Sequence, residues 1–232
     1  MPIYKHYSFD LWLTLIKSNP DFKMQRAILF QKQYNYTNKT IEEVVAIFRQ
    51  VDIMCNTINE KTGKNIDTDE MYLMVLLELN NYNPNLPNIN LPALYNQVEL
   101  ILFNYLPTIY CANTFNTLQQ LQQITNSPFN LLSNTAFIKG SSLQIVLNHL
   151  NLSQFFSFQV YSNEEGISKP NAKIFELMFS KAKVLQPQNN LLPNECIHIG
   201  DNFNADILGA QQIGLQSLQI NTNTNTILNL LP

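Results

Sequence analysis

The sequence predicts an α/β fold, in which helices pack on a parallel β-sheet and an all-helical segment is inserted near the start of the chain. After Pro107, short apolar runs alternate with longer helix-like stretches, which is typical of βαβ units. Between the first apolar run and Pro107, apolar residues instead recur at intervals of three and four. That spacing predicts amphipathic helices.

The first element is a short strand. Ile3–Phe9 is rich in aromatic and β-branched residues and stops at Asp10, as expected of a strand that presents a polar group at its carboxyl end. In the inserted segment, Thr40 and Glu43 form a capping-box signature, and a helix is predicted from there to Gly63. The apolar stripe of this helix consists of Val44, Ile47, Val51, Met54 and Ile58.

Two further helices are predicted before Pro107, over Asp67–Leu79 and Leu94–Tyr105. The Asn- and Pro-rich stretch Asn80–Asn90 separates them because it cannot continue a helix. We therefore expect residues 17–105 to form a helical insert, and residues 1–16 together with 106–232 to form the core that contains the sheet.

The remaining elements of the core alternate in type. Helices are predicted at Thr114–Ile124, Leu143–Leu150, Ala172–Lys183 and Ala205–Ile213. Strands are predicted at Phe129–Leu132, Phe158–Tyr161, Cys196–Ile199 and Leu215–Ile220. Asp10, Ser133 and Asp201 each follow a predicted strand closely. Because the carboxyl ends of parallel strands lie at one edge of the sheet, we expect these three side chains to meet there.

Composition and charge limit the kinds of molecule that the protein is expected to bind. The formal net charge of −3 and the pI near 5.6 provide no basic surface for nucleic acid or anionic lipid. Cys55, Cys111 and Cys196 lack the spacing of a disulfide framework or a zinc site. No apolar run approaches the roughly 20 residues of a membrane span. We expect a cytoplasmic protein, monomer or homodimer, that binds a small molecule and has no nucleic-acid or membrane partner.

Several polar residues are candidates for catalysis on their own chemistry. Asp10 would suit carboxylate nucleophilic catalysis, although a lone aspartate is more often a helix cap or a loop residue. Ser133 and Asn134 are also ordinary turn formers. Asp201 and Asp206 would join Asp10 at the same edge of the sheet, where three carboxylates repel one another unless a cation lies between them.

Four fragments in a fixed order resemble the motifs of the haloacid dehalogenase-like (HAD) hydrolase superfamily. They are Ser8–Leu15, Leu131–Asn134, Gly166–Pro170 and His198–Asp206. The resemblance implies a Rossmann-like core with a helical cap, which would be the insert 17–105. It also implies that Asp10 is a covalent nucleophile.

The resemblance further assigns the other site residues. Thr14, Ser133 and Asn134 would bind the phosphoryl group or a carboxylate. Lys169 would neutralise both the nucleophile and the incoming anion, and it is counted with Asp10 and Ser133 among the catalytic residues. Mg²⁺ would be bound by Asp10, Asp201 and the backbone carbonyl of Trp12, while Asp206 would order a water ligand of the ion and the lysine. Oxygen ligands of this kind suit magnesium.

One position departs from the family pattern. Trp12 stands where HAD phosphatases carry a second aspartate, which protonates the leaving group and activates water. An indole N–H donates but does not titrate near neutral pH, so it cannot replace that carboxylate. Leu13 likewise replaces the usual glycine.

These residues leave three functional hypotheses. The first is a magnesium-dependent phosphatase that acts on a small phosphorylated metabolite through an aspartyl-phosphate intermediate and turns over ordinary alkyl esters poorly. The second is a metal-independent 2-haloacid dehalogenase. Dehalogenases carry an aromatic residue at the position of Trp12, but they lack the carboxylate pair that Asp201 and Asp206 form. The third is a catalytically idle phosphate-binding module.

Other charged residues receive structural predictions. His198 is expected to be a buried structural histidine, and Lys173 a solvated helix residue. Arg26 and Arg49 are the two arginines of the chain, and both lie in the insert. We expect each at the surface, although an arginine there could also bind a carboxylate, a phosphate or a halide.

Overall fold

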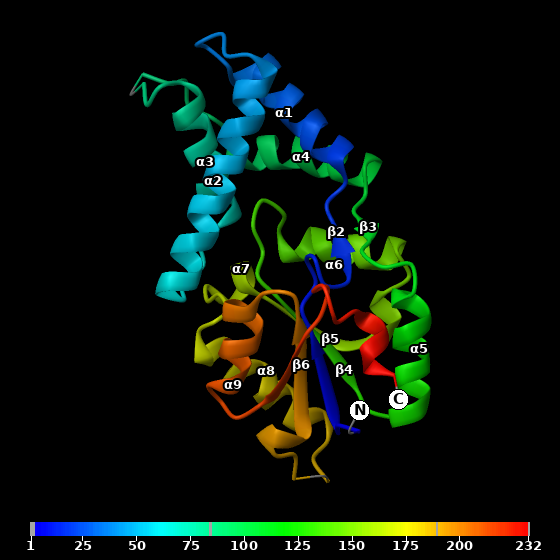
Figure 1. The fold of residues 1–232 in the computed structure, drawn as a ribbon. Helices are drawn as coiled ribbons and strands as arrows, with labels where there is room; N and C mark the ends of the chain where they lie inside the picture. The colour runs from blue at the N-terminus through cyan, green and yellow to red at the C-terminus, as the bar shows by residue number, and fades with distance from the viewer. Residues whose placement is uncertain (1–2, 84, 189, 232) are drawn as a thin grey trace.

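A computed structural model describes residues 3–83, 85–188 and 190–231. Its main sheet is parallel, with the strand order β5-β4-β1-β6-β7 (Figure 1). The strands are β1 (His6–Phe9), β4 (Phe129–Ser133), β5 (Phe156–Tyr161), β6 (Cys196–Gly200) and β7 (Gln216–Gln219). The predicted α/β class with a parallel sheet is confirmed. The first strand begins at His6 and not at Ile3, because its pairing with β6 starts at His6 opposite Cys196.

Helices cover both faces of this sheet. They are α5 (Thr114–Thr125), α6 (Gly140–His149), α7 (Ser162–Glu165), α8 (Ala172–Leu185) and α9 (Gly209–Gln211), with short 3-10 turns η1 (Ser153–Phe155), η2 (Pro193–Glu195) and η4 (Ile227–Leu230). Successive strand residues point to opposite faces: Leu131 packs into one apolar cluster and Leu132 into the other, which includes Phe175 of α8. Packing on both faces makes the strands, and hence the ends that carry the site, a fixed platform.

One predicted helix has a different form. The segment expected to be an α-helix over Ala205–Ile213 is a π-helical turn, η3 (Phe203–Leu208), followed by the short α9. The Asn202 side chain caps this turn by accepting hydrogen bonds from the backbone N–H groups of Asn204 and Ala205. The wider turn carries Asp206, and such turns are frequent at functional sites.

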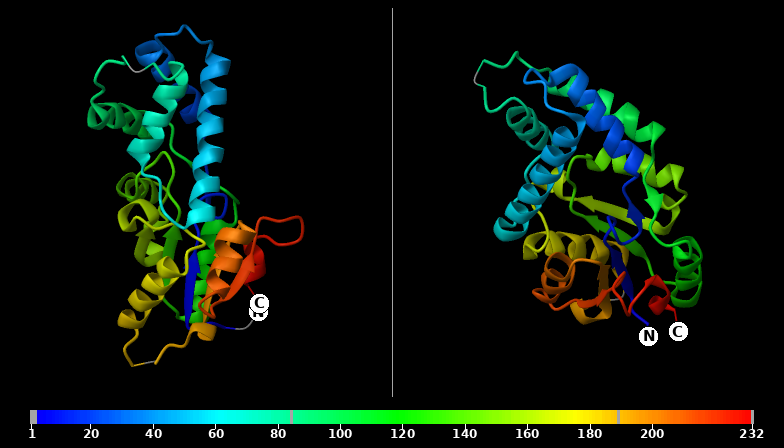
Figure 2. Two further views of the ribbon diagram at one scale, coloured as in Figure 1. Left: turned by 90° about the vertical axis from the view of Figure 1, so that its left-hand side faces the viewer. Right: turned by 45° about the horizontal axis from the view of Figure 1, so that its top comes forward.

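The described residues of the insert form four helices: α1 (Pro20–Tyr34), α2 (Ile41–Thr62), α3 (Thr68–Leu79) and α4 (Leu91–Asn104). Two short strands, β2 (Ile16–Lys17) and β3 (Thr108–Ile109), pair antiparallel where the chain enters and leaves this segment. Figures 1 and 2 show the four helices gathered beyond the end of the sheet at which the parallel strands terminate. The insert therefore faces the edge where the candidate residues were expected.

The longest of these helices, α2, begins and ends as predicted. The Thr40 hydroxyl accepts from the Glu43 backbone N–H at 3.3 Å, and the Glu43 carboxylate accepts from the Thr40 N–H at 2.7 Å. The helix ends at Gly63, whose φ of 66° lies in the left-handed region.

The apolar stripe of α2 is only partly as predicted. Val51 is buried, but Met54 and Ile58 are 40% and 39% exposed. Cys55 and Asn59 are buried instead. In this half of the helix the buried positions Val51, Cys55 and Asn59 recur every four residues.

The end of α2 docks on the loop that precedes α8. The Gly63 carbonyl accepts hydrogen bonds from the Ser168 N–H at 3.2 Å and from the Asn171 side chain at 3.1 Å. The Asn65 N–H donates to the Gly166 carbonyl at 3.2 Å. A Cβ at position 63 would lie 2.7 Å from the Asn171 amide nitrogen, so this close approach requires glycine.

Cys55, Cys111 and Cys196 are free thiols. Within the three described ranges, none of the helices combines the length and apolarity needed to cross a membrane.

Candidate active site

Three carboxylates meet at the carboxyl edge of the sheet, as the sequence predicts. Asp10 follows β1, Asp201 follows β6, and Asp206 lies on η3. Each offers one oxygen atom, and these atoms all lie within 4.8 Å of one another. Asp10 and Asp206 are 6% and 1% exposed, so both are largely removed from water.

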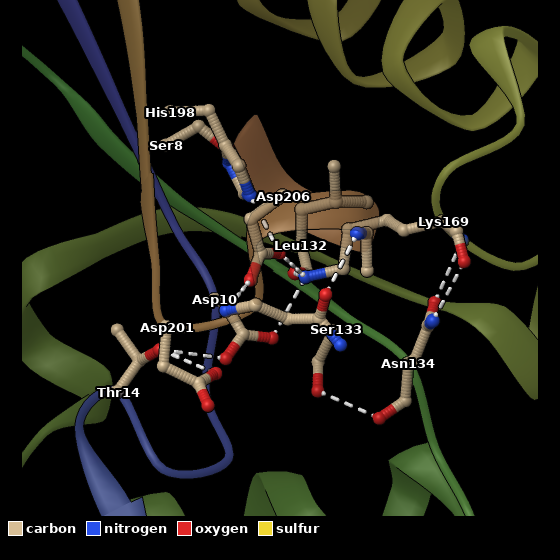
Figure 3. Close-up of polar contacts among 12 residues, drawn as sticks. Ser8, Asp10, Thr14, Leu132, Ser133, Asn134, Lys169, His198, Asp201 and Asp206 are labelled. Carbon is tan, nitrogen blue, oxygen red and sulfur yellow. Dashed lines mark hydrogen bonds and ion pairs between the residues drawn. The ribbon is translucent and has the colours of Figure 1, made fainter. Parts of the chain in front are cut away.

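Lys169 joins two of these carboxylates, as Figure 3 shows. Its ammonium nitrogen lies 2.7 Å from Oδ1 of Asp10 and 2.6 Å from Oδ1 of Asp206, and it also donates to the Leu132 carbonyl at 2.8 Å. The residue is 1% exposed. All three N–H donors of the ammonium group therefore have an acceptor, and the lysine is fixed against the proposed nucleophile.

The charges in this cluster do not balance. Burial, opposed by Lys169 and reinforced by Asp206 and Asp201, raises the pKa of Asp10 to about 7. Burial together with Asp206 raises the pKa of Asp201 to about 6. Burial alone would also raise the pKa of Asp206, but Lys169 and His198 outweigh it and lower that pKa. Asp10, Asp201 and Asp206 could together hold a divalent cation, and their all-oxygen ligand set is of the kind that suits Mg²⁺.

Burial alone would lower the pKa of Lys169, yet the two carboxylates that it contacts raise it. The lysine is therefore charged at neutral pH. It can offset the charge of Asp10 and of an anion that approaches Asp10.

Two other predicted residues hold the cluster in place. The Thr14 hydroxyl lies 2.8 Å from Oδ2 of Asp10 and 3.4 Å from Oδ1 of Asp201. The Asn134 side chain accepts from the Lys169 N–H at 2.8 Å and donates to the Lys169 carbonyl at 3.0 Å. The Ser133 hydroxyl is buried and lies 3.1 Å from the Asn134 carbonyl. The structure thus brings all predicted residues together, and the substrate-binding roles of Thr14, Ser133 and Asn134 stay predictions.

Steric crowding explains why a glycine, Gly200, stands at the end of β6 before Asp201. A Cβ at Gly200 would lie 2.2 Å from the carboxyl carbon of Asp206, so a larger residue would push that carboxylate away from Lys169. The backbone N–H of Asn202 donates to the second oxygen of Asp206 at 3.0 Å.

His198 is buried as predicted, but it also contacts the site, which the sequence did not reveal. Its Nε2 lies 3.1 Å from Oδ1 of Asp206, and its Nδ1 lies 2.9 Å from the Ser8 hydroxyl. Burial, reinforced by Lys169, lowers the pKa of His198 despite the hydrogen bond to Asp206. The signal in the sequence was the two-residue spacing of Ser8 before Asp10 and of His198 before Gly200, which places both on one face of adjacent strands.

Trp12 and Leu13 form the turn after Asp10. Trp12 is half-buried and lines the same cavity as Asp10. Leu13 has a φ of 57°, a left-handed conformation that a glycine at this position would adopt without strain. The Asn221 side chain donates to the carbonyls of Leu13 and Thr14 at 2.6 and 3.1 Å, which holds the turn despite the unfavourable residue.

A cavity of about 420 Å³ opens above the carboxylates. Its floor includes Asp10, Lys169 and Asp201, and its wall comes from the insert. The insert residues are Ser18, Lys23, Arg26, Arg49, Asp52, Asn56 and Glu60. The site is thus built jointly by the sheet edge and the insert.

The prediction of a surface position for Arg26 is wrong. The residue is 6% exposed, and its guanidinium group lies over the rings of Phe48 and Phe137. Phe137 belongs to the loop after β4, far away in sequence, which explains why the local pattern of α1 did not reveal this burial. Arg49 and Lys173 are exposed as expected.

Solved structures share this fold. The HAD hydrolase YfnB of Bacillus subtilis, bound to magnesium, superposes with a TM-score of 0.69 at 19% identity and covers 100% of this chain and 93% of that one. The 2-haloacid dehalogenase of Pseudomonas syringae gives a TM-score of 0.62 at 16% identity, over 94% of this chain and 87% of that one. A magnesium-bound HAD hydrolase and a 2-haloacid dehalogenase therefore share the architecture, and the fold alone does not identify the reaction.

Curated relatives match shorter segments. Glyceraldehyde 3-phosphate phosphatase of Methanothermobacter thermautotrophicus is 30% identical over 128 residues, which is 55% of this chain and 50% of that protein. The Rhythmically expressed gene 2 protein of Drosophila melanogaster is 35% identical over 75 residues, 32% of this chain and 27% of that protein. Pyrimidine 5'-nucleotidase YjjG of Escherichia coli is 31% identical over 80 residues, 34% and 33% of the two chains. The matched segments span half or less of each relative.

The family comparison covers nearly the whole chain. The family model described as haloacid dehalogenase-like hydrolase matches residues 4–214, a range that contains all three clustered carboxylates and Lys169. This match over most of the chain shows that the protein belongs to the haloacid dehalogenase-like hydrolases.

Proposed function

We propose that this hydrolase is a magnesium-dependent phosphatase that acts on small phosphorylated metabolites through an aspartyl-phosphate intermediate. The observation that carries the proposal is the cluster of Asp10, Asp201 and Asp206 with the buried Lys169 between two of them. One relative with a matching segment is named glyceraldehyde 3-phosphate phosphatase, and another is named pyrimidine 5'-nucleotidase, whose reaction also cleaves a phosphate ester.

The chemistry begins at Asp10. A carboxylate oxygen of Asp10 attacks phosphorus, the P–O bond to the leaving group breaks, and its electron pair leaves with the alkoxide oxygen. Lys169 offsets the charge of the attacking carboxylate and of the phosphoryl oxygens. Water then attacks phosphorus of the aspartyl-phosphate, the P–O bond to Asp10 breaks, and inorganic phosphate and the free carboxylate are released. The proton that the water gives up to solvent balances the one that the alkoxide takes from solvent.

The residues that would hold magnesium are Asp10, Asp201 and the Trp12 carbonyl, with Asp206 ordering a water ligand. When bound, the ion would neutralise charge on the phosphoryl group and help to align it. Thr14 bridges two of these carboxylates, so the donor set is already oriented by the protein.

Trp12 shapes the choice of substrate. The indole cannot protonate a leaving alkoxide, and general acid–base assistance contributes roughly 10²–10⁴-fold. Substrates with a stable leaving group, such as acyl phosphates or nitrophenyl phosphate, should therefore react faster than alkyl phosphates.

We also propose the organisation and location that go with this chemistry. Residues 17–105 would act as a cap that covers a core of residues 1–16 and 106–232 and supplies specificity. The enzyme would work in the cytoplasm on a small molecule, as a monomer or homodimer.

A second candidate is a 2-haloacid dehalogenase, which Trp12 favours because carbon–halogen cleavage needs no proton delivered to an alkoxide. In that reaction Asp10 would displace the halide from carbon and form an ester, which water would then hydrolyse. The carboxylates Asp201 and Asp206 beside the nucleophile would repel an incoming carboxylate, and we therefore rank this candidate second.

The decisive experiment is to trap the intermediate. Mass spectrometry of the magnesium-loaded protein with acetyl phosphate or nitrophenyl phosphate should place a phosphoryl adduct on the peptide containing Asp10. Asp10→Asn should show no adduct and no turnover, whereas Asp21→Asn, at an exposed aspartate of α1, should behave as wild type. An adduct on another residue, or full activity of Asp10→Asn, contradicts the proposal. Bromide release from a bromo-acid would establish the dehalogenase instead.

A further inference from the structure

We propose that Arg26 forms a second anion-binding subsite in the active-site cavity, which holds a negatively charged group at the end of the substrate remote from its phosphate. The group would be a carboxylate or a second phosphoryl group. The identity of the phosphate end rests on the proposed function, whereas the subsite rests on the surroundings of Arg26.

Arg26 is held rigidly among aromatic rings. The guanidinium carbon lies 4.1 Å from the ring centroid of Phe48, 4.4 Å from that of Phe137 and 5.2 Å from that of Phe22. Cation–π attraction at such distances stabilises the charge only in part. The rings come from α1, α2 and the loop after β4, so the arginine is fixed where the insert meets the core.

The charge of Arg26 lacks an acidic partner. None of the ion pairs found among the described residues includes it, and its Nε atom is buried without a hydrogen-bond acceptor. Its polar neighbour is the Tyr72 hydroxyl: burial raises the pKa of Tyr72, and Arg26 opposes that rise. Tyr72 itself donates to the Phe137 carbonyl at 2.9 Å. Burying a cation without a counter-charge is unfavourable. An anion bound in the cavity would supply that counter-charge to Arg26.

Arg26 lines the same cavity as Asp10 and Lys169. Lys23 on α1 and Arg49 on α2 add exposed positive charge to the insert wall. The two carboxylates of that wall already have partners: Asp52 accepts from Asn56 at 3.2 Å and Glu60 accepts from Asn202 at 2.8 Å. The donating amides are neutral, so the three cationic side chains of the wall exceed its two carboxylates by one charge. A ligand whose phosphate lies at Asp10 would therefore meet a wall of net positive charge at its other end.

Because Arg26 lies among aromatic rings, a substitution can distinguish an anion-binding role from a purely structural one. An apolar side chain would pack among three phenylalanine rings without leaving an unpaired charge, and replacing buried charges in this way is often neutral or stabilising. We therefore expect Arg26→Met to melt at the same temperature as wild type or higher, while losing ligand affinity. A structural arginine would give the opposite result, a lower melting temperature and unchanged ligand preference.

The test uses a matched pair of non-hydrolysable probes, n-butylphosphonate and 4-phosphonobutyrate, measured by calorimetry in the presence of magnesium. Wild type should bind 4-phosphonobutyrate at least tenfold more tightly. Arg26→Met should lose this preference and still bind n-butylphosphonate as wild type does, and Arg26→Lys should retain part of it because the charge remains. Propane-1,3-bisphosphonate, as a third probe, distinguishes a phosphoryl from a carboxylate group at the subsite.

Arg49→Met is the matched control, since Arg49 is exposed on the same wall and should alter the preference less than Arg26 does. Equal affinity of wild type for the matched pair, no binding of 4-phosphonobutyrate at millimolar concentration, or an unchanged preference in Arg26→Met would overturn the subsite. Turnover of nitrophenyl phosphate is measured separately. A preserved phosphonate preference without turnover would contradict the phosphatase and support the subsite.

Discussion

The Nε2 atom of His198 lies 3.1 Å from the same Asp206 oxygen that accepts a hydrogen bond from Lys169 at 2.6 Å. Asp206 is ionised, because its pKa is lowered, and so it can only accept. Nε2 must therefore donate, which leaves Nδ1 to accept from the Ser8 hydroxyl. The histidine thus positions the carboxylate that in turn holds the lysine beside Asp10.

The first prediction concerns this positioning role. His198→Leu should lower kcat by about 10–100-fold, as for other residues that orient a catalytic group from behind, and should change KM little. His198→Gln should recover much of the loss, because its amide N–H can reach Asp206. Steady-state kinetics with nitrophenyl phosphate provide the measurement, with His149→Gln, at an exposed position of α6, as control. Equal kcat values for the Leu and Gln variants would show that the histidine only fills space.

The second prediction concerns magnesium. Calorimetry should show millimolar or tighter Mg²⁺ binding to wild type and at least a tenfold weaker affinity for Asp201→Asn, which removes one charge from the carboxylate cluster. Asp52→Asn, in the same cavity but outside the cluster, should bind as wild type does. If wild type shows no heat of binding at millimolar Mg²⁺, the metal assignment is wrong.

The third prediction concerns Trp12. Trp12→Asp should raise the turnover of alkyl phosphates far more than that of nitrophenyl phosphate, by up to about 10²–10⁴-fold, because it restores a proton donor to the leaving oxygen. Trp12→Asn is the matched control, since the amide has the same shape and no acid. A dehalogenase would instead lose activity on a bromo-acid, because the new charge repels the substrate carboxylate.

The half-buried indole also packs against the core, so its removal leaves a cavity. Melting temperatures of both variants must therefore accompany the kinetics. A well-folded Trp12→Asp enzyme with unchanged alkyl-phosphate turnover would show that position 12 does not limit the reaction.

The fourth prediction concerns pH and His6. Burial lowers the pKa of His6 from 6.5 to about 4, although its hydrogen bond to Asn130 opposes the shift. Between these values the unfolded chain takes up a proton that the folded chain does not. Stability therefore falls as pH decreases from about 6.5 to 4, with a contribution of about 3 kcal/mol that is fully present above pH 6.5.

His6→Gln keeps a donor to Asn130 and removes this titration. Urea unfolding at pH 7, 6 and 5 should show a shallower loss of stability for His6→Gln than for wild type. If the free energy of unfolding falls equally with pH in the two proteins, His6 does not contribute to the pH dependence of stability.

The meeting of the polar residues at the sheet edge was predictable because it follows from one topological rule. Asp10, Ser133 and Asp201 each come just after an apolar run, and the carboxyl ends of parallel strands share an edge. The helix caps at Thr40 and Gly63 were also local in sequence, and both are confirmed. Features of this kind depend on neighbours within a few residues or on the order of elements.

Burial that depends on distant partners was not predictable. Arg26 is covered by Phe137, and His198 meets Ser8 from the other end of the chain. The face of α2 that is buried near Met54 depends on how the neighbouring helices pack, and Asp206 on the wider turn η3 meets Lys169 from another part of the chain. Each of these is set by tertiary contacts that no local pattern encodes.

Gly63 and Asn65 of the insert are hydrogen-bonded to the loop that carries Lys169. A movement of the insert would therefore affect both the entry of substrate and the position of the lysine. Four hydrogen bonds join these two insert residues to Gly166, Ser168 and Asn171, on both sides of the lysine. If the insert swings out to admit a substrate, the backbone that flanks the lysine loses these restraints at the same moment. An open molecule would then hold its ammonium group less firmly against Asp10, so the nucleophile would be fully prepared only after the substrate is enclosed, and idle reaction with bulk solvent would be suppressed.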